Sequence, residues 1–454
     1  MDVEASIEEG FMVNVSKKSI VKSITPLEDP PQVLSLSNLD LLSGRFPVTY
    51  FYFYRKPAND GGNFASIVEA LKSSLAVTLS YFYPFAGRIL SNLSTGEPEI
   101  VCDNTGALLL EADAISDLKK LDFRDINQFM QGKLVHIQPD FPVQVQVTKY
   151  TCGGISLTFS FDHALGDATA FHRFLLSWSE ISRNVPISCR PDHSRNLRAR
   201  IPPTYHPSLD QAFLKCTMED ILNIPTPKTL LKRLYHVEYE SINKLQKLAS
   251  SDGRSRTKIE AFSAYLWKMM VRAIDVKFHA TCKMGWLVDG RRRMRNGESD
   301  PSPDYIGNVL SLAVGEASIA ELKNGTIADV SSKVHEAISK VTTRSHFLDL
   351  IDWIECHRPG LMLARVVLGQ GGPTLVVSSG RRFPVAELDF GFGRPVLGTV
   401  CSTIEKIGVG YVNQRASARG DGSWTLSAIL WPELAAAFDS DPIIQPMSTR
   451  YLQL

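Results

Sequence analysis

The chain has 454 residues, of which 44% are hydrophobic and 21% are charged. This is the composition of an ordinary globular protein, and the length is enough for two or three domains. Its 49 basic and 48 acidic side chains leave a net charge of +1. We therefore expect neither nucleic acid nor a membrane surface among its partners.

The N-terminal residues and the cysteines indicate a cellular compartment. Residues 1–20 are acidic where a secretory signal is basic and then apolar, and no later stretch approaches the ~20 apolar residues that span a bilayer. The seven cysteines are scattered and include no Cys-x-x-Cys pair, which argues against a disulfide framework and a zinc site. We expect a cytoplasmic protein without a metal.

A hairpin followed by a helix is predicted in the first half of the chain. Apolar and polar residues alternate over 143–147 and again over 155–161, which is typical of two half-buried strands, and Gly153 supplies the turn between them. Helical spacing follows at Phe171, Phe174, Leu175, Trp178 and Ile181. Residues 162–167 must therefore cross from a strand end to a helix start.

A proline-rich stretch divides the chain into two parts. Residues 184–207 contain five prolines, many polar side chains and little periodicity, as interdomain linkers do. We predict an N-terminal domain over residues 1–183, a linker over 184–215 and a C-terminal domain over 216–454.

The C-terminal domain mixes helical and strand patterns. Thr257 and Glu260 have the spacing of a capping box at the start of a helical run over 257–272. Strand-like runs cover 374–378, 397–412 and 423–431. The predicted class is α/β, with mixed sheets in two large domains.

His163 is the strongest candidate for a catalytic side chain. It lies in FDHALGDA directly after a predicted strand, and the carboxyl edge of a sheet is where α/β proteins bind ligands. A histidine here could also cap the next helix or bond a backbone carbonyl, and the spacing alone does not decide. Asp167, four residues later, is either a charge partner of the imidazole or, as we favour, a structural carboxylate that pairs with a distant arginine.

Five segments in this order along the chain resemble the landmarks of one family. They are LSNLDLL (36–42), YFYPFAGRI (81–89), HALGD (163–167), VDGRRRM with YIGN (288–308), and DFGFG (389–393). Together they resemble the plant BAHD family of acyl-CoA dependent acyltransferases, over nearly the whole chain. The resemblance implies two chloramphenicol acetyltransferase-like domains with mixed β-sheets flanked by helices, joined by a long crossover linker, with a channel between them that meets at His163.

The resemblance also implies a reaction. His163 would be the general base for direct transfer from coenzyme A to a small hydroxyl-bearing acceptor, because a neutral imidazole can take the acceptor's proton near pH 7. Asp167 would orient the loop and pair with Arg291. No Gly-x-Ser-x-Gly elbow for serine chemistry occurs in the sequence. The expected enzyme is a monomer that needs no cofactor beyond its acyl-CoA substrate.

Two further segments are candidate binding sites. Arg254, Ser255, Arg256 and Lys258 precede or open a predicted helix, which suits a phosphate, although a solvated charged loop has the same pattern. The resemblance implies that this loop contacts coenzyme A phosphates. Arg382 has the position at which relatives with acidic acceptors carry an arginine, but Gly380 replaces the tryptophan that normally precedes it, and Arg382 could instead form an internal ion pair.

The DFGFG segment is expected to be structural. Asp389, Gly391 and Gly393 offer tight turns and an ionic anchor but no base or nucleophile, and Phe392 stands where the family has tryptophan. We expect this segment to shape the domain interface.

The acceptor is predicted from the departures from the family pattern. Ala168, the DFGFG variant and the glycine turn resemble the branch that esterifies phenylpropanoid alcohols such as coniferyl alcohol. The alternatives are a hydroxycinnamoyl-CoA transferase with shikimate-like, quinate-like or amine acceptors, and a non-catalytic scaffold. Intact His163 and Asp167 speak against the scaffold.

Overall fold

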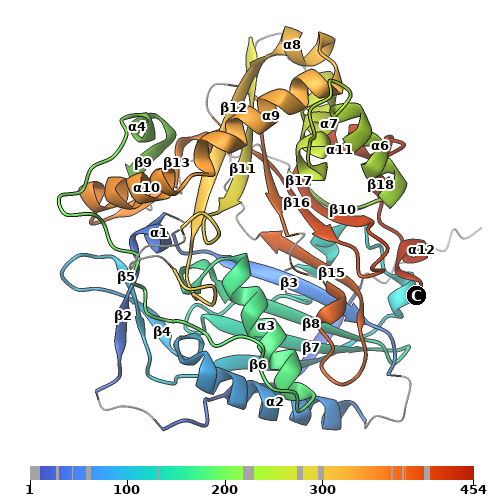
Figure 1. Ribbon diagram of the computed structural model, residues 1–454. Coiled ribbons are helices and arrows are strands. Elements are labelled where there is room, and N and C mark those ends of the chain that lie inside the picture. Colours follow the sequence, from blue (N-terminus) through green and yellow to red (C-terminus); the bar gives the residue numbers. More distant parts are fainter. Residues whose placement is uncertain are drawn as a thin grey trace, which may run out of the picture.

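The computed structural model describes residues 11–26, 30–42, 44–57, 63–130, 132–217, 230–273, 280–294, 301–369, 372–380, 383, 385–402 and 409–454. Two mixed β-sheets with helices packed on them form two domains, one below the other in Figure 1. Among the described residues, no helix has both the length and the apolar character needed to cross a membrane.

The first sheet carries the predicted hairpin. Its strand order is β1-β6-β7-β8-β3-β15, and neighbours are antiparallel except β6 and β7. The helices α2 (Phe64–Tyr81) and α3 (Ala168–Ser182) lie together over one face (Figure 1). The strand bounds are β1 Val13–Val21, β3 Pro47–Tyr54, β6 Ala107–Ala114, β7 Val143–Tyr150, β8 Ile155–Asp162 and β15 Pro395–Ser402.

The hairpin and the helix after it are confirmed, but the expectation of half-buried strands is wrong. β7 and β8 pair antiparallel around Gly153, whose φ is 81°. Gln144 and Gln146, on the face expected to be solvated, are only 5% and 2% exposed. A second core covers that face, and Gln146 Nε2 donates to the carbonyl of Lys133 at 2.8 Å. Backbone groups of this covering layer replace water as partners of the polar side chains.

The second sheet has the order β12-β11-β14-β16-β17-β10-β18, in which β11, β14 and β16 run parallel. Its helices are α6 Tyr239–Ala249, α7 Lys258–Ala273, α8 Ile319–Asn324, α9 Ile327–Val341 and α11 Pro432–Asp439. Its strands are β10 Leu231–Val237, β11 Thr281–Asp289, β12 Leu310–Ser318, β14 Thr374–Ser379, β16 Gly410–Ala416, β17 Trp424–Leu430 and β18 Gln445–Pro446.

The helix predicted over 257–272 is present as α7, and its capping box is confirmed. The backbone amide and Oγ1 of Thr257 both donate to Glu260 Oε2 at 2.7 Å, and the amide of Glu260 donates back to Thr257 Oγ1 at 3.3 Å. The strands predicted at 374–378 and 423–431 are β14 and β17.

The remaining elements connect and cover the two sheets. Two small sheets contain β2 Val33–Ser35, β4 Arg88–Ser91 and β5 Pro98–Val101, and β9 Phe213–Cys216 with β13 Leu361–Ala364. Other helices are α1 Asn38–Leu41, α4 Ser208–Ala212, α10 Arg344–His357 and α12 Thr449–Leu452. The 3-10 helices are η1 Tyr83–Ala86, η2 Leu118–Lys120, η3 Ile126–Phe129, η4 His163–Leu165, η5 Arg365–Leu368 and η6 Val385–Glu387.

The two sheets do not follow the predicted segments of the chain. β15 belongs to the segment assigned to the C-terminal domain, yet it pairs along β3 from Tyr54 to Val48 and completes the first sheet. The strand-like run predicted over 397–412 is thus two strands in different sheets, β15 and β16. The predicted linker is partly buried, since Cys189 and Leu197 within it are only 4% and 3% exposed.

Candidate active site at the end of strand β8

The chain crosses from strand to helix at the predicted place, and short polar side chains fix the crossing. Asp162 ends β8 and its Oδ1 accepts from the amide of Ala164 at 2.9 Å. At Gly166 a Cβ would lie 2.6 Å from the Cβ of Ala170, so a side chain there would push the loop away from α3. Asp167 is the N-cap of α3.

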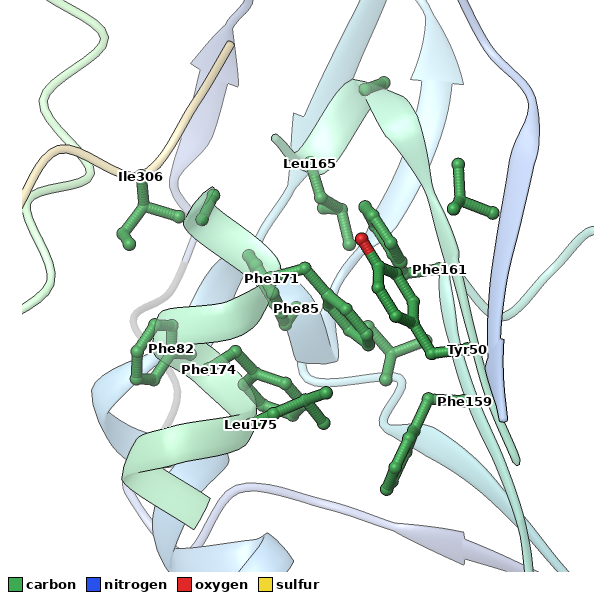
Figure 2. Packing of buried hydrophobic residues seen from close by; sticks show 14 of the residues in the cluster. Tyr50, Phe82, Phe85, Phe159, Phe161, Leu165, Phe171, Phe174, Leu175 and Ile306 are labelled. Atoms are coloured by element: carbon green, nitrogen blue, oxygen red, sulfur yellow. The ribbon is translucent and has the colours of Figure 1, made fainter. Parts of the chain in front are cut away.

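His163 is held through its backbone and through its ring. Its amide donates to the carbonyl of Phe46 at 3.0 Å, and its carbonyl accepts from Asn308 Nδ2 at 3.0 Å. The imidazole stacks on Phe46 at a centroid distance of 4.7 Å and on Phe161 at 6.4 Å. Figure 2 shows Phe161 in the apolar cluster of the first domain, beside Phe171 and Tyr50. The ring therefore has few orientations open to it.

The surroundings of His163 favour the neutral ring. Burial lowers its pKa below the ordinary 6.5, and the carboxylates of Asp167, Asp162 and Asp40 oppose the shift without cancelling it. Nδ1 is buried with no hydrogen-bond partner in another residue, while the residue as a whole is partly exposed. Since Asp167 caps the helix, the structure does not give His163 the capping role.

The carboxylate of Asp167 is fully engaged inside the protein. Oδ1 accepts from the amides of Thr169 at 3.0 Å and Ala170 at 3.2 Å, and Oδ2 accepts from Arg291 Nη1 at 2.7 Å and the amide of Val309 at 3.0 Å. Burial by itself would raise the pKa of Asp167, but Arg291 and these donors outweigh it and lower the pKa. The side chain is 1% exposed, which fits a structural carboxylate.

Arg291 connects that carboxylate to the second domain. The structure contains the ion pair that the resemblance implied, and the guanidinium also donates from Nη2 to the carbonyl of Gly307 at 2.7 Å. The amide of Arg291 donates to Asp289 Oδ1 at 2.9 Å. The landmark VDGRRRM with YIGN thus meets the HALGD loop at one buried ion pair.

Sequence reasoning missed three side chains that anchor the loop. Asp40 is 0% exposed and accepts from the amide of Asn308 at 2.7 Å, while Arg195 Nη1 pairs with it at 2.9 Å. Arg195 Nη2 donates to the carbonyl of Leu165 at 2.7 Å. Asp40 lies in LSNLDLL and Asn308 in YIGN. As polar residues in largely apolar landmarks, both could have been identified from the sequence. Arg195 lies in the predicted linker and carries no sequence signal.

The DFGFG segment is a turn that packs on the first domain. Asp389 Oδ1 accepts from the amides of Gly391 at 2.8 Å and Gly393 at 3.0 Å, and both glycines have positive φ, 97° and 113°. Phe392 packs edge-on against Tyr54 at 4.9 Å, and Phe390 against Trp178 at 5.1 Å. This geometry has the structural character expected of the segment.

The loop proposed for coenzyme A phosphates divides into exposed and buried parts. Arg254 and Ser255 are exposed, and Lys258 lies with Nζ 4.4 Å from the centre of the Tyr239 ring. Arg256 is only 6% exposed and donates from Nη2 to Ser332 Oγ at 2.9 Å. The expectation that all four face a phosphate is therefore corrected for Arg256, whose side chain is engaged inside the domain.

Two other expectations concern Arg382 and the absence of a metal. Arg382, the candidate acceptor contact, lies outside the described residues. Within the described ranges, no group of three or more His, Cys, Asp and Glu side chains is placed to hold a metal ion.

Comparisons with known proteins show which family and which fold the chain resembles. The model of a family described as the Transferase family matches residues 11–443. The chain is 30% identical to hydroxycinnamoyltransferase 1 of Oryza sativa subsp. japonica, over 85% of this chain and 89% of that protein. It is also 30% identical to anthranilate N-benzoyltransferase protein 1 of Dianthus caryophyllus, over 91% and 96%. The fold is similar to that of vinorine synthase, with a TM-score of 0.70, 20% identity and coverage of 94% and 96%.

Proposed function

The chain belongs to the plant BAHD family of acyltransferases, and on this premise we propose that it transfers an acyl group directly from coenzyme A to a hydroxyl of a small plant metabolite. The observation that carries the proposal is the placement of His163. A neutral imidazole stands at the end of β8, and Phe46 from the first domain and Asn308 from the second hold its backbone.

The proposed reaction has two steps. His163 takes the proton of the acceptor hydroxyl through Nε2 while the acceptor oxygen attacks the thioester carbonyl. The tetrahedral intermediate then collapses, the carbon–sulfur bond breaks, and the imidazolium returns the proton to the coenzyme A thiolate. An ester and free coenzyme A result, and no acyl-enzyme forms.

Asp167 is proposed to act through position rather than through charge on the imidazole. Its four hydrogen-bond donors and its pairing with Arg291 fix the start of α3, and this fixes the turn that carries His163. A misplacement of about 1 Å at the base can cost about 100-fold in rate.

The donor site is proposed to include the loop before α7. Arg254, Ser255 and Lys258 remain candidates for the coenzyme A phosphates, since cations and the free amides of a helix N-terminus both favour anions. We propose that the enzyme acts as a monomer and needs no cofactor beyond the acyl-CoA.

Two acceptor classes are supported by different observations. Ala168 and the DFGFG variant favour a neutral phenylpropanoid alcohol such as coniferyl alcohol. The names of the relatives favour an acceptor of hydroxycinnamoyl or benzoyl groups that is itself an acid or an amine, as anthranilate is.

A free-thiol assay tests the proposed function. Acetyl-, benzoyl-, coumaroyl- and feruloyl-CoA would be offered with coniferyl alcohol, shikimate and anthranilate, to wild type and to His163→Ala. We expect acceptor-dependent thiol release in the wild type and a loss of about 100-fold to 10,000-fold in the variant. Release that survives the variant would contradict the assignment of the base. If the wild type releases no thiol with any pair of donor and acceptor, a non-catalytic scaffold is favoured instead.

A further inference from the structure

One arginine is enclosed at the junction of the two domains. Arg415 in β16 is only 2% exposed, and its guanidinium carbon lies 4.7 Å from the centre of the Tyr50 ring and 5.9 Å from that of Phe383. Its Nη1 reaches the hydroxyl of Tyr52 in β3 at 3.5 Å. A side chain of the second sheet therefore reaches β3, the strand next to β15 in the first sheet.

The charge of Arg415 has no acidic partner in the described part of the chain. No described carboxylate lies within ion-pair distance of the guanidinium, whereas Arg195 and Arg291, which are also buried, each pair with an aspartate. The Nε of Arg415 is buried and makes no hydrogen bond. Proteins rarely bury a charge in this way, because desolvation is costly unless an opposite charge or hydrogen bonds offset it.

The space for Arg415 depends on Gly380. A Cβ at this position would lie 2.9 Å from Nε and 3.0 Å from Cγ of Arg415. Any side chain at position 380 would displace the guanidinium. Arg415 can therefore take its buried position only because Gly380 replaces the family's tryptophan. The space beside position 380 is thus occupied by the guanidinium of Arg415.

Arg415 is connected to the base by three ring contacts. It lies over Tyr50, Tyr50 stacks on Phe161 at 5.9 Å, and Phe161 stacks on His163 at 6.4 Å. Figure 2 shows Tyr50 and Phe161 side by side. Arg415 and His163 therefore lie at the two ends of one continuous series of ring contacts.

Further polar groups surround this position. Burial, Arg415 and Arg173 lower the pKa of His172, in α3, to about 3, so its ring is neutral and adds no second positive charge. On the same face of β16 as Arg415, Asn413 donates from Nδ2 to Ser378 Oγ at 2.6 Å, and its Oδ1 is buried without a partner. Buried polar atoms without partners indicate a place for a polar ligand.

We propose that Arg415 binds a carboxylate of the acceptor and makes the enzyme selective for an acidic acceptor over its neutral analogue. The guanidinium fork matches a carboxylate in shape and charge, and an anion there would compensate the buried cation. The inference rests on the proposed transferase function, and it favours the acidic acceptor over coniferyl alcohol. The phosphates of coenzyme A do not fit the role, since their exposed candidate cations lie in the loop before α7.

Calorimetry with pairs of ligands tests this proposal without turnover. Shikimate, quinate and anthranilate would be titrated, each beside its methyl ester, into the enzyme saturated with coenzyme A. We expect at least one acid to bind the wild type about 30-fold or more tightly than its ester. Arg415→Gln should lose that preference while binding the ester as before. Arg419→Gln, which removes an exposed arginine paired with Asp421, is the matched control and should keep the preference.

Kinetics and stability separate the possible outcomes. In turnover, Arg415→Gln should raise KM for the acid by a similar factor and leave KM for acyl-CoA unchanged.

If no acid binds more tightly than its ester, or if Arg415→Gln keeps the preference for the acid, the proposal is overturned even when thiol release proceeds. A large fall in Tm of Arg415→Gln without a change in selectivity would likewise make the arginine structural. If calorimetry shows the preference but no pair releases thiol, the transferase function fails and the arginine site stands.

Discussion

The imidazole of His163 lies among aromatic rings, and this environment sets its protonation state. Its pKa is lowered mainly by burial, so the ring is neutral at pH 7 without help from a directly bonded carboxylate. Asp167, the nearest candidate for such help, directs its oxygens to Arg291 and to backbone amides.

The first prediction concerns the pH dependence of the base. The proposed reaction makes the neutral ring the active form, and the pKa of His163 lies below 6.5, so kcat/KM should be level around pH 7 and fall only below pH 6.5. The measurement is kcat/KM for the best donor and acceptor between pH 5 and 8, with Tm recorded across the range. A lower limb centred above pH 6.5 would contradict the environment described for His163.

The second prediction concerns the Asp167–Arg291 pair. Asp167→Asn leaves Arg291 charged and buried, and we expect a loss of about 3 kcal/mol in the free energy of unfolding together with a fall in kcat. Glu321→Gln breaks an exposed pair with Lys333 and should cost less than about 1 kcal/mol.

The same pair gives a pH-dependent signature. The pKa of Asp167 is lowered on folding, so its contribution is present above the ordinary value of about 3.9 and is lost as the pH falls through the lowered value. Chemical denaturation at pH 7 and pH 3 should therefore show a smaller difference between wild type and Asp167→Asn at the lower pH. An equal difference at both values would show that the carboxylate charge is not the source of stability.

At the scale of elements, two short segments perform different tasks with similar residues. In both the HALGD loop and the DFGFG turn, one aspartate oxygen accepts two backbone amides. The first aspartate is buried and fixes the start of α3, next to the turn that carries His163. The second closes a turn whose aromatic residues pack on the first domain, away from any candidate base.

This difference predicts different effects of substitution in the turn. Asp389→Ala removes the acceptor of the Gly391 and Gly393 amides and should lower the free energy of unfolding by about 1 to 2 kcal/mol. Well below Tm, kcat/KM should stay within about threefold of the wild type. Asp389→Asn keeps an acceptor oxygen and should retain most of the stability. A loss of activity in a folded Asp389→Ala protein would give the turn a part in the chemistry.

At the scale of the whole molecule, the second half of the chain contributes a strand to the first sheet. β15 comes from the second half of the sequence but pairs along β3 in the first sheet. The β3 residues from Tyr50 to Tyr54 are 3% exposed or less, which requires β15 and the segments beside it. The second half of the chain therefore completes the core of the domain that carries His163.

We predict that the first half cannot fold alone. A fragment of residues 1–215 lacks β15 and bares the aromatic residues of β3, so it should show no cooperative thermal unfolding by circular dichroism. Co-expression with residues 216–454 should restore a soluble complex with a single transition. A fragment 1–215 with a sharp transition of its own would show that the shared strand is dispensable.

The sequence by itself determined the elements with strong local patterns and singled out His163 as the candidate base. The β7–β8 hairpin, α3 and the capped helix α7 follow from periodicity, glycine turns and capping residues, because these signals act within a few residues of one another. The ordered landmarks determined the family and named His163, Asp167 and Arg291.

Only the tertiary structure decided what depends on distant partners. The burial of Gln144 and Gln146 depends on the irregular segment that contains Lys133 and Gln138. The place of β15 in the first sheet depends on chain hundreds of residues away, and the anchoring by Arg195 depends on a linker without pattern. The same holds for Arg415, which local sequence marks as an ordinary strand residue. Its burial and its lack of a described acidic partner appear only when the second domain is placed on the first.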